Sequence, residues 1–346
     1  MRMARAALLL LLLGTGLGGC SAEIETVGPP IGPEALEDTK AIMRDGAELP
    51  LRRYLPVEPP EAIILALHGF NDYSRAFEGP GAFFAQHGIA LYAYDQRGFG
   101  AAPSPGRWFG TATLDDDVRS MAALLRAKYP GKKLFLLGES MGGAVAMTAM
   151  TSAAPPDVDG VILSAPAVWA RETQSVFQRA GLFVFSHTLA WMPLSGSGFA
   201  ITPSDNEPML RALSADPLVR KRTNVSTLTG LVNLMDDALL SAPQLKAPAL
   251  FLIGERDEIV PAAASCLMLS RLEKRPPAEW RVAFYPVGYH MLLRDLQAEL
   301  VLTDIAAWVK DRRADLPSGN EVLAGDDAKR PAALQEQWLC HKRRQS

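Results

Sequence analysis

A serine lies between glycines at residues 138–142, which read Gly-Glu-Ser-Met-Gly and fit the pattern G-x-S-x-G. The segment follows the apolar run Leu134–Leu137 and precedes small and apolar residues that are typical of a helix start. In this context the pattern predicts a sharp strand-to-helix turn that projects the serine hydroxyl from the edge of a sheet. We therefore predict that Ser140 is a nucleophile.

A serine hydroxyl is a weak nucleophile at neutral pH and needs a general base beside it. In chains with this type of turn the acid and then the histidine follow the serine. Three histidines come after Ser140, namely His187, His290 and His341. His290 lies just beyond an apolar run at 282–285, in the loop 286–290, which places it at the carboxyl edge of a parallel sheet, where ligand sites form. We predict His290 as the base.

The acid should follow the preceding apolar run, at 250–253. Three carboxylates lie there, and we choose Asp257, with Glu255 and Glu258 as rivals by position. The acid would hold the imidazole in the correct tautomer and stabilise its protonated form.

Two backbone N–H groups are needed to bind the oxyanion of the intermediate. We expect one from Met141, the residue after the nucleophile, and one from the loop that begins at His68. Phe70 is our candidate in that loop and Asn71 is the adjacent alternative. We expect His68 itself to be a buried residue that shapes the turn.

Short apolar runs recur along the chain with helical patterns between them, which predicts an α/β fold with a mostly parallel sheet. The runs lie at 63–67, 89–94, 134–137, 161–163, 250–253 and 282–285. A helix is predicted around 114–125 with Asp115, Asp116 and Asp117 in its first turn, and another at 295–312. The run of strands breaks at 167–243, which carries bulky apolar residues without a clear strand.

The pattern divides the chain into five segments. We expect a signal peptide at 1–19, a tether at 20–44, a core at 45–166 and 244–312, a helical cap at 167–243 and a tail at 313–346, with an anchoring helix around Trp338.

The first twenty residues have a charged start, a short apolar run and small residues, as a secretory signal does. Residues 17–20, Leu-Gly-Gly-Cys, also resemble a bacterial lipobox, in which the cysteine is lipidated. We expect Cys20 to anchor the chain to the cell envelope, in the outer membrane for a Gram-negative host; the alternative is an unmodified cysteine after an ordinary signal.

Cys266 and Cys340 either pair or stay as free thiols.

Composition excludes several classes of protein. The 346 residues are 48% hydrophobic and 21% charged, which is ordinary for a globular chain and excludes disorder as the main state. A formal charge of −3 gives no field that would gather nucleic acid. The five histidines form no HExxH pattern and the three cysteines no CxxC pattern, so we expect no metal site.

Taken together, these motifs resemble the serine α/β-hydrolases of the monoacylglycerol lipase and lysophospholipase group, over about residues 45–312. The shared motifs are His68-Gly69, Asp95–Gly100, residues 138–143, residues 254–257 and Tyr289-His290. The resemblance implies Ser140, Asp257 and His290 as the triad, Phe70 and Met141 as the oxyanion hole, and no metal or organic cofactor. The loop Phe70-Asn71-Asp72-Tyr73 and residues 101–104 depart from the group's usual pattern, near the expected acyl pocket.

The resemblance implies a carboxylic ester hydrolase that acts on lipid-like esters, such as monoacylglycerols or lysophospholipids, through an acyl-enzyme. Two alternatives stay open. One is acyl transfer or aminopeptidase activity with the same residues, and the other is a non-catalytic envelope lipoprotein that binds apolar ligands.

Overall fold

The computed structural model describes residues 24–195, 201–272, 280–322 and 340. The expected signal peptide, Cys20, Trp338 and His341 lie outside the described residues. Within the described ranges no helix has both the length and the apolar character that a bilayer span requires.

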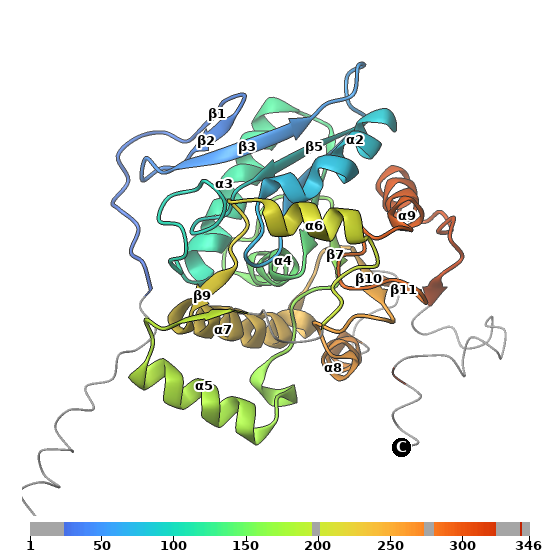
Figure 1. Cartoon of the computed structure of the whole chain (residues 1–346). Helices are drawn as coiled ribbons and strands as arrows, with labels where there is room; N and C mark the ends of the chain where they lie inside the picture. The colour runs from blue at the N-terminus through green and yellow to red at the C-terminus, as the bar shows by residue number, and fades with distance from the viewer. Residues whose placement is uncertain (1–23, 196–200, 273–279, 323–339, 341–346) are drawn as a thin grey trace, which may run out of the picture.

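The centre of the molecule is a sheet in which the apolar runs predicted from the sequence are parallel neighbours (Figure 1). The six parallel strands lie in the order β5 (Ile89–Tyr94), β4 (Ala62–Leu67), β6 (Lys133–Glu139), β7 (Gly160–Ser164), β10 (Ala249–Gly254) and β11 (Trp280–Tyr285). Antiparallel strands extend both edges: β3 (Glu48–Tyr54), β2 (Lys40–Ile42) and β1 (Ala35–Leu36) beside β5, and β12 (Glu321–Val322) beside β11.

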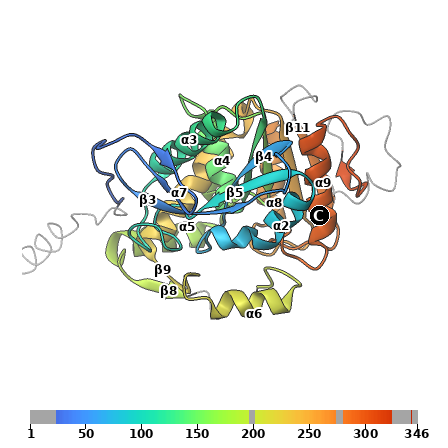
Figure 2. The ribbon, with the colours of Figure 1, turned by 90° about the horizontal axis from the view of Figure 1, so that it is seen from above.

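Helices cover both faces of the sheet, which explains why the strands are apolar throughout. In β4, Ile63 and Leu65 contribute to one core and Ile64 and Ala66 to the other, because successive side chains of a strand point to opposite faces. The first core lies under α3 (Thr111–Lys128), α4 (Met141–Thr151), α7 (Val225–Ser241) and α8 (Ala262–Leu272), and the second under α2 (Glu78–Gln86) and α9 (Ala298–Lys310). Figure 2 shows α3 and α4 on one side of the strands and α2 on the other.

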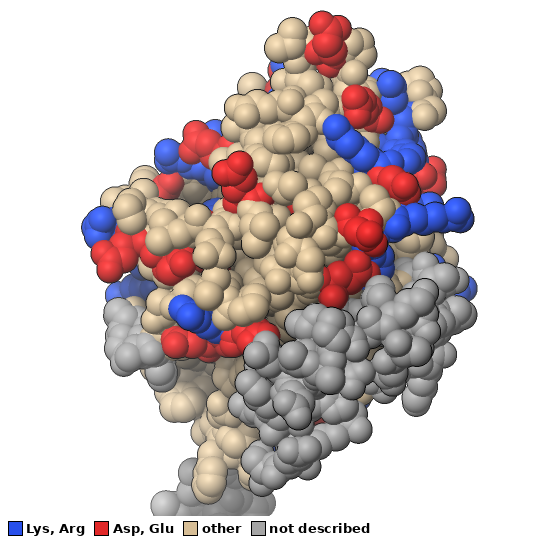
Figure 3. Space-filling model, turned by 90° about the vertical axis from the view of Figure 1, so that its right-hand side faces the viewer, with Lys and Arg blue, Asp and Glu red and all other residues tan. Residues whose placement is uncertain are grey.

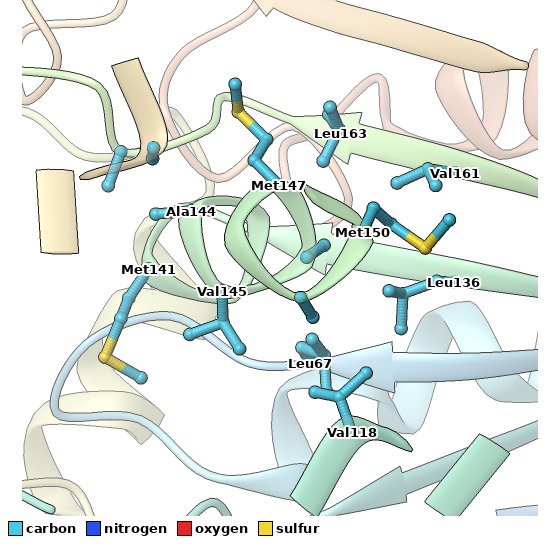
Figure 4. Packing of buried hydrophobic residues seen from close by; sticks show 14 of the residues in the cluster. Leu67, Val118, Leu136, Met141, Ala144, Val145, Met147, Met150, Val161 and Leu163 are labelled. Atoms are coloured by element: carbon cyan, nitrogen blue, oxygen red, sulfur yellow. The ribbon is translucent and has the colours of Figure 1, made fainter. Parts of the chain in front are cut away.

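Helix α4 is enclosed on all sides, and every residue from 141 to 150 is buried. Figure 4 shows Val145 near Leu67 and Val118, and Met150 near Leu136 and Val161. The helix that begins at the predicted nucleophile is therefore fixed by the first core, which gives the serine a rigid support.

The segment expected to form the cap leaves the sheet after β7 and returns at β10. It holds α5 (Val176–Thr188), α6 (Glu207–Ala215) and α7, as expected for a helical segment. It also holds two short paired strands, β8 (Pro193–Ser195) and β9 (Arg222–Asn224), which the sequence analysis did not predict. Figure 1 shows α5 at the lower edge of the molecule, and α5 packs against α7. Among the described residues there are also three short 3₁₀ helices, at Ser74–Phe77, Arg171–Thr173 and Ala242–Gln244.

Two sequence expectations need correction. The segment assigned to a tether contains β1 and β2, which pair with the edge of the sheet; strands of two and three residues are too short to show a pattern in the sequence. Helix α3 begins at Thr111, so Asp115, Asp116 and Asp117 lie in its second turn and not in its first. Asp115 and Asp117 are buried there and accept hydrogen bonds from Thr148 and Arg97.

The cysteines that the sequence left undecided form a disulfide. Cys266 of α8 is bonded to Cys340, with 5.4 Å between their Cα atoms. The bond joins the C-terminal tail to the core across 74 residues of sequence.

Candidate active site

Ser140 lies at the junction of β6 and α4, where the strand-to-helix turn was predicted. Its backbone has φ 54° and ψ −116°, which is a strained conformation for a residue with a side chain. The Ser140 N–H donates to the Ser164 carbonyl at 3.0 Å, and its own carbonyl accepts from Ala144 and Ala167. These bonds to β7 and α4 hold the strained turn in place.

Gly142 allows α4 to pass directly against the end of β4. A Cβ at this position would lie 2.1 Å from the Leu67 carbonyl oxygen, a separation that no side chain permits. The glycine therefore brings the loop after Leu67 next to the nucleophile.

His290 is fixed by a carboxylate from the neighbouring loop. Its Nδ1 lies 2.8 Å from Oδ2 of Asp257, and both side chains are buried. Asp257 Oδ1 accepts the backbone N–H groups of Ile259 and Val260, at 2.8 and 2.9 Å, so the carboxylate cannot rotate away. Because a carboxylate oxygen accepts a hydrogen bond, the neutral imidazole donates from Nδ1 to Asp257, and its free lone pair is on Nε2.

The structure separates the three carboxylates that competed for the role of the acid. Of the three, only Asp257 contacts His290 within the described residues. Glu258 accepts the backbone N–H of Thr202 at 2.7 Å, and so it holds the segment between α5 and α6. The close approach of the two loops depends on Gly254, since a Cβ there would lie 2.4 Å from the Tyr289 carbonyl oxygen.

Ser140 and His290 line one cavity of about 500 Å³. The Ser140 hydroxyl makes no hydrogen bond to His290 within the described part of the chain. Such contacts are often long in a protein without substrate and shorten when it binds. Much of the remaining lining is apolar and comes from the cap segment, mainly from its helix α7: Trp169, Leu182, Leu228, Leu231, Val232 and Met235.

The two predicted oxyanion donors belong to segments that adjoin Ser140. Met141 is the first residue of α4, so its N–H has no acceptor within the helix. Phe70 lines the cavity, and the preceding residue, Gly69, lies against the Ser140 side chain. Neither the Phe70 nor the Met141 N–H donates to another group among the described residues. Asn71, the alternative, has its side chain bonded to Thr223 of β9.

His68 and His187 do not take part in the site. The buried His68 ring contacts the Gly69 carbonyl through Nδ1 and accepts the Gln96 N–H at Nε2, so both of its nitrogens are occupied. Burial lowers the pKa of His68 and keeps the ring neutral. His187 is exposed on α5 and its Nδ1 contacts the Phe183 carbonyl.

The segment Asp95–Gly100 supports the fold. Arg97 pairs with Asp45 and Asp117, each at 2.7 Å, and Asp95 accepts the N–H groups of Ser74 and Ala101. None of these side chains lines the cavity that contains Ser140.

Sequence reasoning missed three charged residues beside the nucleophile. Asp72, Glu139 and Arg294 all line the cavity, and Arg294 forms a buried ion pair with each of the two carboxylates. They come from three segments far apart in the sequence, so no spacing could reveal them. The only signal was the position of Glu139 next to Ser140. Asp72 and Arg294 also line a second cavity, of about 650 Å³, between α2, α6 and α9.

The described residues hold no group of three or more histidine, cysteine, aspartate or glutamate side chains that is arranged to bind a metal ion. Figure 3 shows acidic and basic side chains interspersed on one face, in keeping with the near-neutral charge of the chain.

Comparison with known families gives a match to the model described as serine aminopeptidase, S33, which spans residues 58–297. The chain is 25% identical to a monoacylglycerol lipase of Mycolicibacterium smegmatis over 260 residues, which cover 74% of this chain and 90% of that protein. It is 27% identical to the human monoglyceride lipase over 278 residues, which cover 78% and 89% of the two chains.

Solved structures show the same fold. The crystal structure of a monoacylglycerol lipase from Paleococcus ferrophilus matches with a TM-score of 0.63 at 24% identity, covering 76% of this chain and 98% of that one. A soluble variant of the monoglyceride lipase from Saccharomyces cerevisiae, in complex with a substrate analogue, matches with a TM-score of 0.63 at 19% identity, covering 85% and 98%.

Proposed function

We propose that this chain, which belongs to the serine aminopeptidase S33 family of α/β-hydrolases, hydrolyses lipid-like carboxylic esters such as monoacylglycerols or lysophospholipids. The chain is a hydrolase of the lipase and esterase type; its substrate and its acyl-enzyme are our proposal. The observation that carries the proposal is the placement of Ser140 and of the Asp257-bound His290 on one largely apolar cavity.

In the proposed reaction the Ser140 oxygen attacks the ester carbonyl while His290 Nε2 takes the hydroxyl proton. The N–H groups of Phe70 and Met141 stabilise the negative oxygen of the tetrahedral intermediate. As the intermediate collapses, the imidazolium gives its proton to the leaving alcohol and an acyl-serine remains. Water then attacks the acyl-serine by the same steps in reverse, with His290 as the base.

The lining of the cavity supports a substrate with a long acyl chain. Leu182, Leu228, Leu231 and Met235 offer an apolar wall beside the nucleophile. Burying each methylene of an acyl chain against such a wall contributes about 0.8 kcal/mol.

The outer surface of α5 supports action at a lipid surface. Phe177 is 88% exposed, Phe183 64% and Trp191 71%, and Val176 lies beside them. Val176, Phe177 and Phe183 belong to α5, and Trp191 follows three residues after its end. Several large apolar side chains exposed on one short segment fit a surface that contacts a membrane or a partner. On the inner side of the same helix Leu182 lines the reaction cavity, so a lipid held against α5 would lie next to the site.

We further propose that the chain is exported and anchored in a bacterial envelope through a lipidated Cys20, with no nucleic-acid partner. The disulfide between Cys266 and Cys340 supports export, because such bonds are typical of oxidising compartments.

A panel of substrates tests the proposed function. Purified wild-type protein and Ser140→Ala would be assayed on monoacylglycerols and lysophospholipids of several chain lengths, and on aminoacyl arylamides. We expect ester hydrolysis that rises with acyl length and is lost in Ser140→Ala. Hydrolysis of the arylamides alone would instead support an aminopeptidase.

Two further measurements test the membrane proposal. Cells fed a labelled fatty acid should produce labelled protein from the wild-type gene and none from Cys20→Ala. Phe177→Ser with Phe183→Ser should reduce binding of the soluble domain to phospholipid vesicles, while hydrolysis of a short, water-soluble ester stays unchanged. Equal vesicle binding by both proteins would contradict the role of α5.

A further inference from the structure

Arg294 links the three loops that carry the site. Its Nη1 lies 2.8 Å from Oδ2 of Asp72, two residues beyond Phe70. Its Nη2 donates to Oε2 of Glu139 at 3.1 Å, and Glu139 directly precedes Ser140. Arg294 itself lies four residues after His290, in the same loop. One guanidinium thus connects the loop 68–72 (the oxyanion loop), the turn at residues 139–140 (the nucleophile turn) and the loop 286–297 that carries His290.

This cluster is buried, so its charges act strongly on their surroundings. The side chains of Arg294, Asp72 and Glu139 are 11%, 7% and 3% exposed. Oε1 of Glu139 and Nε of Arg294 have no hydrogen-bond partner among the described residues. Burial raises the pKa of the Glu139 carboxyl, and the Arg294 charge acts against that rise.

Most of the charges around His290 are negative. The ionisable groups that face it come from the nucleophile turn, from the loop after β4, from the loop after β10 and from its own loop: Glu139, Asp72, Asp257, Glu258, Arg294 and Asp295. Another cation, Arg256, lies over the Tyr289 ring at 5.9 Å and does not line the cavity. Arg294 is the cation that directly contacts Asp72 and Glu139.

We propose that Arg294 is a positioning residue that holds the oxyanion loop and the nucleophile turn in register and neutralises Asp72 and Glu139 beside the reacting groups. The proposal rests on the proposed ester hydrolysis by Ser140 and His290. Without the cation, the two carboxylates would favour the imidazolium of His290 and oppose the negative charge of the oxyanion.

The test compares pH profiles of kcat and kcat/KM for wild type, Arg294→Met and Arg294→Lys on a short, water-soluble p-nitrophenyl ester. For Arg294→Met we expect kcat to fall about 10- to 100-fold with little change in KM. We expect the acid limb of the kcat/KM profile, that is, the pH range in which kcat/KM falls on acidification, to shift to higher pH by about one unit. The reason is that a net negative site holds a proton more tightly. Arg294→Lys keeps the charge and should retain the wild-type acid limb.

A second variant separates this role from simple structural support. Adding Glu139→Gln to Arg294→Met removes one unpaired carboxylate, so the acid limb should return toward the wild-type position and part of kcat should recover. Arg97→Met is the matched control, since Arg97 also joins two buried carboxylates but lies outside the cavity. It should lower thermal stability without moving the acid limb.

The outcomes are distinct. An Arg294→Met protein that folds and keeps the wild-type pH profile, or an acid limb that Glu139→Gln does not move back, overturns the proposal. Absence of esterase activity in the wild-type protein would count against the proposed function itself.

Discussion

At the scale of single residues, the site depends on a few side chains that the backbone fixes before substrate arrives. Asp257 is held by two backbone N–H groups and in turn orients His290. Ser140 has a conformation that costs about 1–3 kcal/mol and that the surrounding hydrogen bonds must enforce. The sequence motifs predicted these residues because the proposed chemistry requires fixed residue types.

Asp257→Asn tests the role of the acid. The amide would fit the same space, but its NH₂ group would favour the wrong tautomer of His290. We expect the fold to persist and kcat to fall by about 10⁴-fold. Ester hydrolysis and a thermal melt measure the two effects.

Glu258→Gln is the matched control, because Glu258 lines the cavity but bonds to Thr202. Similar losses in the Asp257 and Glu258 variants would show that the site lost its shape in both, and would contradict the assignment of Asp257 as the acid.

At the scale of elements, packing at the end of β4 places the oxyanion loop beside α4. Gly142→Ala introduces a Cβ that would lie 2.1 Å from the Leu67 carbonyl oxygen, so α4 must move. We expect the free energy of unfolding to fall by about 1–3 kcal/mol, as it does on overpacking of other protein cores, and ester hydrolysis to be lost.

Gly79→Ala provides the comparison for that variant. Gly79 lies in α2, and a Cβ there meets nothing within 4 Å. Because alanine is the better helix former, this variant should be neutral or more stable by up to about 1 kcal/mol. Urea unfolding of both proteins tests the pair; equal stability of the two variants would contradict the packing argument.

Asp115 makes the packing of α3 on α4 depend on pH. It accepts a hydrogen bond from Thr148 of α4, and burial raises its pKa from 3.8 to about 7. The folded protein therefore holds this proton more tightly than the unfolded chain, and stability falls as pH rises from about 4 to about 7. Asp115→Asn removes this dependence.

We expect Asp115→Asn to gain stability over wild type as pH rises to about 7, and then to keep a constant advantage. The advantage should be at most a few kcal/mol, since one pKa unit corresponds to about 1.4 kcal/mol. Urea unfolding at pH 5, 6, 7 and 8 measures it. A stability difference that is the same at all four values would show that Asp115 does not titrate in this range.

The sequence predicted the elements that have strong apolar runs. The six parallel strands and α9 were expected, because strands buried on both faces are apolar throughout. The strands β1, β2 and β12 were missed because two or three residues show no period, and Asp115–Asp117 were misplaced because α3 starts one turn earlier than its apolar pattern. The cluster around Arg294 was missed because only the fold brings its loops together.

At the scale of the whole molecule, the disulfide fastens the tail to the core. Cys266 and Cys340 are separated by 74 residues, so the bond restricts the unfolded chain over a long loop. We expect Cys340→Ser, or reduction of the wild type, to lower the free energy of unfolding by about 2–4 kcal/mol. Unfolding in urea with and without reductant measures this; a reductant that affects Cys340→Ser as strongly as wild type would contradict it.

The central claim is that Ser140 becomes nucleophilic because the fold brings it to His290 and Asp257. The most direct measurement is labelling of the folded protein by a fluorophosphonate, followed by identification of the modified residue by peptide mass spectrometry. The account predicts one modified residue, Ser140, with no labelling of Ser140→Ala and slow labelling of His290→Ala. Labelling of another residue, or equal rates in wild type and His290→Ala, would contradict it.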